Sequence, residues 1–219
     1  MTGLFKFVME GGVWMWPIMA AQIVSFALIA ERLAALYFRR GVRAASRVRI
    51  YEEDIKRGQM DRVLSRAERS NDPVAQLVRT GAQAVLHSSG KEEIQLKMEE
   101  LVMEESSRIE KHIGMLSMLA NVATLLGLLG TIVGMIRSFS SIASAAGAEK
   151  ARLMAEGISE AMNATAYGLI VAVPALVMFA VLQNRANHLI EDLNKAALRL
   201  YIWFGFNVDT PTKSSRRSS

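Results

Sequence analysis

The feature that most constrains this chain is a run of 24 residues without a charge, from Ile113 to Ile136. Two similar runs accompany it: Val13 to Ala30, with 18 uncharged residues, and Ala161 to Leu182, with 22. A helix of about 20 apolar residues crosses the hydrocarbon core of a bilayer. Such runs are hard to place in a soluble protein of 219 residues. The sequence therefore predicts an all-α membrane protein with three transmembrane helices.

Lysine and arginine are distributed unevenly outside these runs. Residues 38–112 carry 15 of them and the stretch after residue 182 carries six, whereas residues 1–12 carry one and residues 137–160 carry three. Because positive residues stay on the cytoplasmic side, both termini and both connections can be assigned. The predicted segments are a periplasmic N-terminus (1–12), a first transmembrane helix (13–37), a cytoplasmic helical region (38–112), a second transmembrane helix (113–136), a periplasmic loop (137–160), a third transmembrane helix (161–182), and a cytoplasmic helix with a disordered tail (183–219).

The composition argues against several kinds of site. Cysteine is absent, which excludes disulfides, thiolate metal sites and a cysteine nucleophile. The three histidines, His87, His112 and His188, are not in ligand spacing, so no metal site is expected. The net charge of +5 comes from residues beside apolar runs, which indicates a bilayer rather than a nucleic acid as the partner. No catalytic set or phosphate-binding loop is visible, so we expect neither an enzyme nor a cofactor.

The cytoplasmic region has the signals of successive helices. Asn71-Asp72-Pro73 predicts a helix start, with a capping side chain followed by proline in the first turn. A helix beginning at Lys91 meets no glycine or proline before Gly114, and we expect it to continue unbroken into the second span. Its acidic residues suit either cation binding or a solvated face with pairs such as Glu93–Lys97, and the second interpretation is favoured.

Polar residues interrupt the second and third spans. Ser117, Asn121, Thr124 and Thr131 fall on one face of the second span. The third opens with Glu160, followed by Asn163 and Thr165. Hydroxyl and amide groups in membrane helices often serve only packing, and Glu160 suits a helix N-terminus. A carboxylate beside a span also costs a few kcal/mol unless it faces water or a partner. An ion pathway and an assembly scaffold both remain open.

Small residues predict close packing between these spans. Gly130 and Gly134 form a GxxxG motif in the second span. Pro174 lies within the third span, where it is expected to kink the helix and free a backbone carbonyl. The residues expected to serve helix packing are Gly127, Gly130, Gly134, Gly168 and Pro174.

Three stretches resemble one known family. GLLGTIVGMIRSF (127–139) resembles the second-span motif of the TolQ/ExbB/MotA family of proton-channel motor subunits. GISEAMNATAYGLIVAVPA (157–175) is similar to that family's third-span motif, and GGVWMWP (11–17) with Glu31-Arg32-Leu33 is similar to its first span. Three spans rather than four favour the TolQ/ExbB branch, which includes gliding-motility relatives. Met162 departs from the usual leucine, and Asn163 fills the variable position beside it.

The resemblance implies a homopentamer in the bacterial inner membrane. The pentamer would surround a dimer of an ExbD/TolR-like one-span partner, which supplies a membrane aspartate. Proton flow would drive work on the envelope: import energisation, envelope integrity or gliding, acting through a TonB/TolA-like or gliding-machinery protein. Glu160, Thr165 and Thr131 match the family's polar positions, and Thr131 would face the central partner. With the other polar residues of these spans, the expected ion pathway is lined by Thr131, Glu160, Thr165, Asn163, Asn121 and Thr124. The alternative is a non-conducting membrane scaffold.

Overall fold

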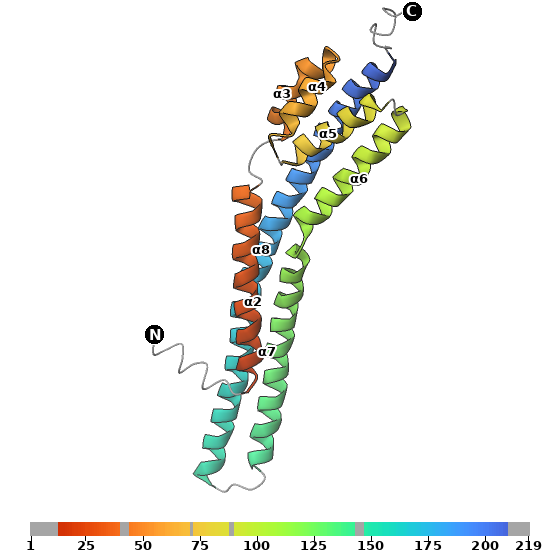
Figure 1. The fold of residues 1–219 in the computed structure, drawn as a ribbon. Helices are drawn as coiled ribbons and strands as arrows, with labels where there is room; N and C mark the ends of the chain where they lie inside the picture. Colours follow the sequence, from red (N-terminus) through yellow and green to blue (C-terminus); the bar gives the residue numbers. More distant parts are fainter. Residues whose placement is uncertain (1–12, 40–43, 71, 88–89, 143–146, 210–219) are drawn as a thin grey trace, which may run out of the picture. The chain divides into compact units, whose positions relative to one another are not determined.

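The computed structural model describes residues 13–39, 44–70, 72–87, 90–142 and 147–209, and every regular element in these ranges is a helix (Figure 1). The elements are α2 (Met15–Leu33), the π-helical segment η1 (Ala34–Arg39), α3 (Ala44–Lys56), α4 (Met60–Ala67), α5 (Pro73–Leu86), α6 (Lys91–Glu110), α7 (Ile113–Ile142) and α8 (Ala148–Asp209). Three helical stretches are long and apolar enough to cross a membrane: Met15–Leu36, which includes α2, Lys91–Ser141, which includes most of α7, and Glu149–Phe206 within α8. The all-α class and the three spans are thereby confirmed. The predicted N-terminus 1–12 and the last ten residues of the tail lie outside the described residues.

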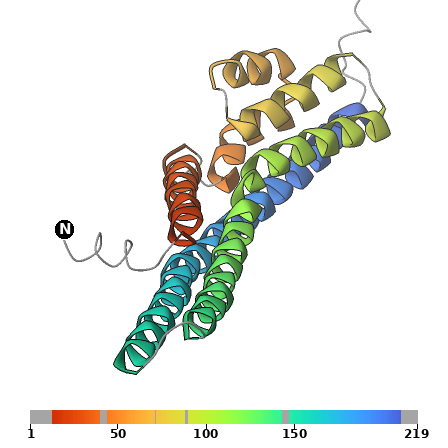
Figure 2. The same ribbon diagram turned by 90° about the horizontal axis from the view of Figure 1, so that it is seen from below.

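The chain divides into two compact units, which are described separately. The membrane unit comprises Met1–Ala35 and His112–Gln183, and the head unit comprises Leu36–Lys111 and Asn184–Ser219. In the membrane unit, α7 and the first part of α8 run antiparallel, with α2 beside them (Figures 1 and 2). Residues of all three helices form a common buried cluster: Met15, Ile18, Ala123, Tyr167 and Val171.

The outer faces of the membrane unit are apolar and exposed on the isolated chain. Phe26, Leu125 and Ile136 are each at least 60% exposed. Exposed apolar surface on this scale marks contact with lipid or with another protein. This pattern agrees with helices whose inner faces pack together and whose outer faces meet the bilayer.

The connection between α7 and α8 is shorter than the loop predicted for residues 137–160. Helix α7 continues to Ile142 and α8 begins at Ala148. Arg152 supports the first turns of α8 through ion pairs with Glu149 and Glu156 at 2.8 Å. Such pairs, three and four residues apart, stabilise a helix beyond the apolar span.

In the head unit, α3 to α6 pack against the last part of α8. The α8 side chains Leu193, Ala196, Leu200 and Phe204 recur at helical spacing and are buried in the core of this unit. A Cβ atom at Gly81 of α5 would overlap the Phe204 ring, so this glycine allows the ring to pack directly on the α5 backbone.

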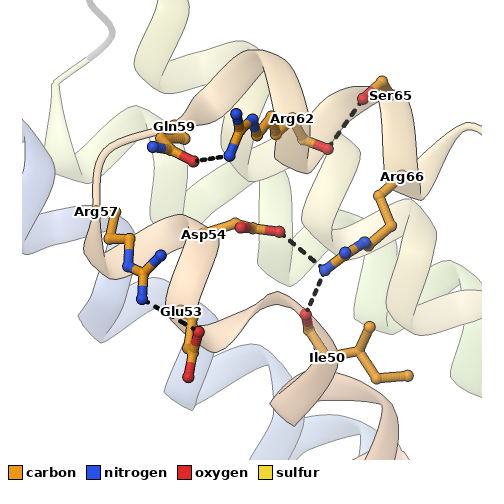
Figure 3. Close-up of polar contacts among 8 residues, drawn as sticks. All are labelled: Ile50, Glu53, Asp54, Arg57, Gln59, Arg62, Ser65 and Arg66. Carbon is orange, nitrogen blue, oxygen red and sulfur yellow. Dashed lines mark hydrogen bonds and ion pairs between the residues drawn. The ribbon is translucent and has the colours of Figure 1, made fainter.

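Polar contacts tie α3 to α4 on the surface of the head unit (Figure 3). The Arg66 guanidinium donates to the carbonyl oxygen of Ile50 at 3.0 Å and to Asp54 Oδ2 at 2.9 Å. Glu53 of α3 forms an ion pair at 3.4 Å with Arg57, the residue that follows the helix. At least one partner of each ion pair is exposed, so each pair contributes about 0–1 kcal/mol to stability.

The predicted helix start at Asp72-Pro73 is confirmed. Asp72 is the N-cap of α5: its Oδ1 accepts a hydrogen bond from the Ala75 N–H at 2.9 Å, and Pro73 is the first helical residue. Ser70 donates to Asp72 Oδ2 at 2.6 Å, and Arg47 forms an ion pair with the same oxygen. The predicted Glu93–Lys97 pair is also present, at 2.5 Å.

The predicted unbroken helix from Lys91 into the second span is wrong. Helix α6 ends at Glu110 and α7 begins at Ile113, and His112 between them has a φ of 63°. A histidine adopts this left-handed conformation more readily than a bulky apolar residue. Its Nδ1 lies 3.5 Å from Glu31 Oε2 and from Arg32 Nη2 on α2. No glycine or proline at this point marks the break in the sequence. The helix ends here because His112 contacts residues of α2, which is distant in sequence.

Candidate functional site

The candidate site lies in the contact between α7 and α8, which we call the glycine seam and define by Gly127, Gly130, Gly134 and Gly168. A Cβ atom at Gly130 would lie 2.6 Å from Ala164 Cβ, and one at Gly134 would lie 2.8 Å from Ala161 Cβ. A Cβ atom at Gly168 would lie 2.7 Å from the Ala123 carbonyl oxygen. Side chains at these positions would force the two helices apart. The sequence therefore brings the α7 and α8 backbones into close approach.

Two threonine hydroxyls meet inside this seam. Thr131 of α7 and Thr165 of α8 are hydrogen-bonded to each other through their Oγ1 atoms. The carbonyl oxygen of Gly127 lies 3.2 Å from Thr131 Oγ1 and 3.0 Å from Thr165 Oγ1, and the Ala161 carbonyl lies 3.5 Å from Thr131 Oγ1. Each hydroxyl donates one hydrogen and also accepts, so Thr131 can donate to Thr165 while Thr165 donates to the Gly127 carbonyl, and either donor can turn to another acceptor. Both threonine residues are half-buried.

Glu160 lies nearer the α7–α8 connection than this threonine pair. Its Oε1 is 3.5 Å from Arg137 Nη1, and the Glu160 side chain is 30% exposed. Antiparallel helices place Arg137, six residues after Thr131, level with Glu160, five residues before Thr165. This ion pair was not predicted from the sequence, because Arg137 was used only to assign the membrane orientation. The antiparallel register of the two helices was the signal that could have predicted the pair.

The other predicted pathway residues are not brought to the threonine pair in this chain. Asn121 and Thr124 are exposed on α7, and the Thr124 hydroxyl donates to the Ala120 carbonyl of its own helix at 3.0 Å. Asn163 of α8 is half-buried. The structure thus assembles Thr131, Thr165 and the Gly127 carbonyl, with Glu160 and Arg137 as a separate charged pair.

A second polar contact joins α2 to α8 and was also missed. The Tyr167 hydroxyl donates to Gln22 Oε1, and Tyr167 is buried. Nearby in sequence, Ser25 of α2 is 3% exposed. Gln22 and Ser25 are the polar side chains of an otherwise apolar stretch of the first span. Polar residues in such a stretch could have predicted a contact with another helix.

The seam offers hydrogen-bond donors and acceptors. Hydroxyl groups can act as both, and a backbone carbonyl accepts. Among the described residues, no group of three or more His, Cys, Asp or Glu side chains is placed to hold a metal ion. The arrangement offers hydrogen-bonding groups in an apolar setting, with one carboxylate near the end of the seam.

Comparisons with known proteins agree with this reading of the fold. Residues 69–195 match the model of the MotA/TolQ/ExbB proton channel family. A solved structure of MotAB from C. jejuni contains a chain of similar fold, with a TM-score of 0.60 and 17% sequence identity, covering 88% of this chain and 74% of that one. The comparison with curated proteins found no match. The structural likeness concerns the fold, and the family match covers more than half of the sequence.

Proposed function

Because this chain belongs to the MotA/TolQ/ExbB proton channel family and has three membrane-spanning helices, we propose that it is the multi-pass subunit of an ion-driven motor in the inner membrane. Protons moving down their gradient would pass beside the glycine seam and drive mechanical work. The observation that carries the proposal is the Thr131–Thr165 contact at the Gly127 carbonyl. It places exchangeable hydrogen bonds inside a helix contact built otherwise from glycine and alanine.

A second subunit completes the proposed pathway. Residues 113–136 and 161–182 contain no charged side chain, so these spans supply hydroxyls and carbonyls but no carboxylate. We propose an ExbD/TolR-like one-span dimer that provides the membrane aspartate and sits inside five copies of this chain. The MotAB structure of similar fold supports a two-component arrangement. Three spans favour the TolQ/ExbB branch, with import energisation, envelope integrity or gliding as the driven process.

Native mass spectrometry tests the assembly. The detergent-purified chain is measured alone and after co-expression with its one-span partner. We expect five copies alone and five plus two with the partner. A monomer or dimer that ignores the partner would leave no central space and would contradict the motor proposal.

A non-conducting scaffold is the second candidate, because both threonine hydroxyls find acceptors within the chain itself. Glu160→Gln separates the two functions, since it removes a charge while keeping the shape of the side chain. The motor proposal expects proton flux into proteoliposomes containing the complex to fall while assembly stays intact. The scaffold proposal expects no proton flux above that of empty liposomes from either protein, and it expects cellular transport or motility to be unchanged by the substitution.

A further inference from the structure

A small cavity lies between α2 and α8, apart from the threonine pair of the seam. Its volume is about 30 Å³, and Ser25, Gln22, Ile170 and Pro174 are among the residues lining it. A water molecule needs about 10–15 Å³ of such space and two to four polar partners. The cavity therefore has room for one water molecule, and the polar groups in its wall decide whether one binds.

Ser25 supplies the first polar group. The residue is 3% exposed, and its Oγ has no hydrogen-bond partner among the described residues. A buried hydroxyl without a partner is costly, and native proteins satisfy nearly all such groups with protein or ordered water. Ser25 forms part of the cavity wall, so a water there can reach its hydroxyl.

Pro174 creates the second polar group. Proline has no N–H, and Pro174 lies inside α8. The carbonyl of Ile170, four residues earlier, therefore lacks its usual helical donor, and Ile170 lines the same cavity. The Gln22 side chain is the third polar group. Its Oε1 accepts a hydrogen bond from the Tyr167 hydroxyl, and its NH2 group can donate two more hydrogen bonds.

We propose that this cavity binds one ordered water molecule that links the first and third membrane helices. The water donates to the Ile170 carbonyl and hydrogen-bonds with the Ser25 hydroxyl, with the Gln22 amide as the remaining neighbour. The water thus donates to the Ile170 carbonyl, which has no N–H donor at Pro174, and it links α2 to α8 through hydrogen bonds. This assignment is independent of the proposed ion pathway.

The sign of one stability change tests the proposal. In the full-length chain purified in detergent, Ser25→Ala removes a partner of the water, and we expect the melting temperature to fall by about 2–4 °C. If the cavity were dry, the same change would remove an unsatisfied buried hydroxyl. The melting temperature would then rise or stay the same, which would overturn the proposal. Ser140→Ala, at an exposed serine of α7, is the matched control and is expected to be silent.

Coupling with Pro174 separates a bridging water from a simple packing effect. Pro174→Ala restores an N–H that can bond to the Ile170 carbonyl, so the water loses that acceptor. We expect the Ser25→Ala effect to shrink by at least about half in the Pro174→Ala background. Full additivity of the two changes would contradict a shared water.

Direct observation completes the test. In a high-resolution cryo-EM map of the full-length chain in lipid nanodiscs, we expect one round density about 2.7–3.0 Å from Ser25 Oγ and from the Ile170 carbonyl oxygen. A continuous tube of density reaching out to the bilayer would identify a lipid acyl chain and overturn the proposal. Absence of any density in a map that shows other buried waters would overturn it as well.

Discussion

At the scale of single residues, Thr165 is the α8 side chain that hydrogen-bonds across the seam to α7. Its hydroxyl contacts Thr131 and the Gly127 carbonyl, and Thr165→Val removes both contacts while keeping the volume nearly constant. We expect this variant to reduce proton flux through the reconstituted complex by about tenfold or more, as loss of hydrogen bonds worth about 1.4 kcal/mol implies. Thr165→Ser keeps the hydroxyl and should retain most of the flux. Wild-type flux in a correctly assembled Thr165→Val complex would argue against a hydroxyl-lined pathway.

The Arg137–Glu160 pair allows a charge-swap test. Arg137→Glu places two carboxylates side by side, and we expect a loss of about 1 kcal/mol, or about 2–4 °C in melting temperature. The double variant Arg137→Glu/Glu160→Arg restores opposite charges and should recover most of this loss. Thermal unfolding in detergent is the measurement. Equal melting temperatures for the single and double variants would show that the pair contributes nothing.

At the scale of helices, the glycine seam depends on backbone approach. Gly168→Ala would bring a Cβ atom to 2.7 Å from the Ala123 carbonyl oxygen, which belongs to a backbone that cannot easily move. We expect a destabilisation of about 1–3 kcal/mol. Gly114→Ala is the matched control, because a Cβ atom there meets nothing within 4 Å. Melting curves of the two variants make the comparison, and equal stability would contradict close contact at Gly168.

The α5 cap responds to pH in a defined direction. Burial raises the pKa of the Asp72 carboxyl, but hydrogen bonds from Ser70, Ala75 and Arg47 outweigh burial and leave this pKa below its usual value. The stabilisation is therefore complete above about pH 4, near the unfolded pKa, and is lost as the pH falls through the folded pKa. Asp72→Asn keeps a capping oxygen but removes the charge.

We expect Asp72→Asn to lower the melting temperature by about 2–4 °C near pH 7, in keeping with about 1 kcal/mol for the charged contacts. Below about pH 4 the difference from wild type should shrink, because the wild-type carboxyl also becomes neutral. Melting temperatures across this range check the prediction. A difference that grows on acidification would have the wrong sign.

The helices show which local sequence signals are sufficient to predict secondary structure. The span helices follow from uninterrupted apolar runs, and the α5 start follows from Asp72-Pro73, because each signal lies within one continuous stretch of the chain. The break at His112 depends on Glu31 and Arg32, about 80 residues earlier. A local pattern cannot reveal a contact that exists only after two helices pack.

At the scale of the whole molecule, the absence of cysteine makes topology directly measurable. Glu53→Cys and Glu156→Cys each introduce a single thiol at an exposed side chain. The positive-inside rule predicts that a membrane-impermeant maleimide labels Glu156→Cys in intact spheroplasts but labels Glu53→Cys only after lysis. Labelling of Glu53→Cys in intact spheroplasts would reverse the predicted orientation.

The candidate site shows the limit of sequence reasoning for the molecule as a whole. The resemblance to the family's motifs singled out Thr131, Thr165 and Glu160, and the structure brings the two threonines together. The sequence did not predict the Arg137–Glu160 pair or the Gln22–Tyr167 contact, because each depends on which faces of separate helices meet. Asn121 and Thr124 share a helix face with Thr131 by spacing, but in this chain they face outward, and the surface they meet remains a prediction about the assembly.

The glycine seam also has a genetic consequence. Every amino acid that a single-base change can put in place of glycine carries a side chain. At Gly127, Gly130, Gly134 and Gly168, each missense change of this kind therefore adds at least one carbon where the opposite helix already lies close. Leu125 and Ile132 of α7 are exposed on this chain, so other apolar side chains can be accommodated there. Variation in the gene should therefore accumulate on the outer face of this helix and spare the four glycine codons.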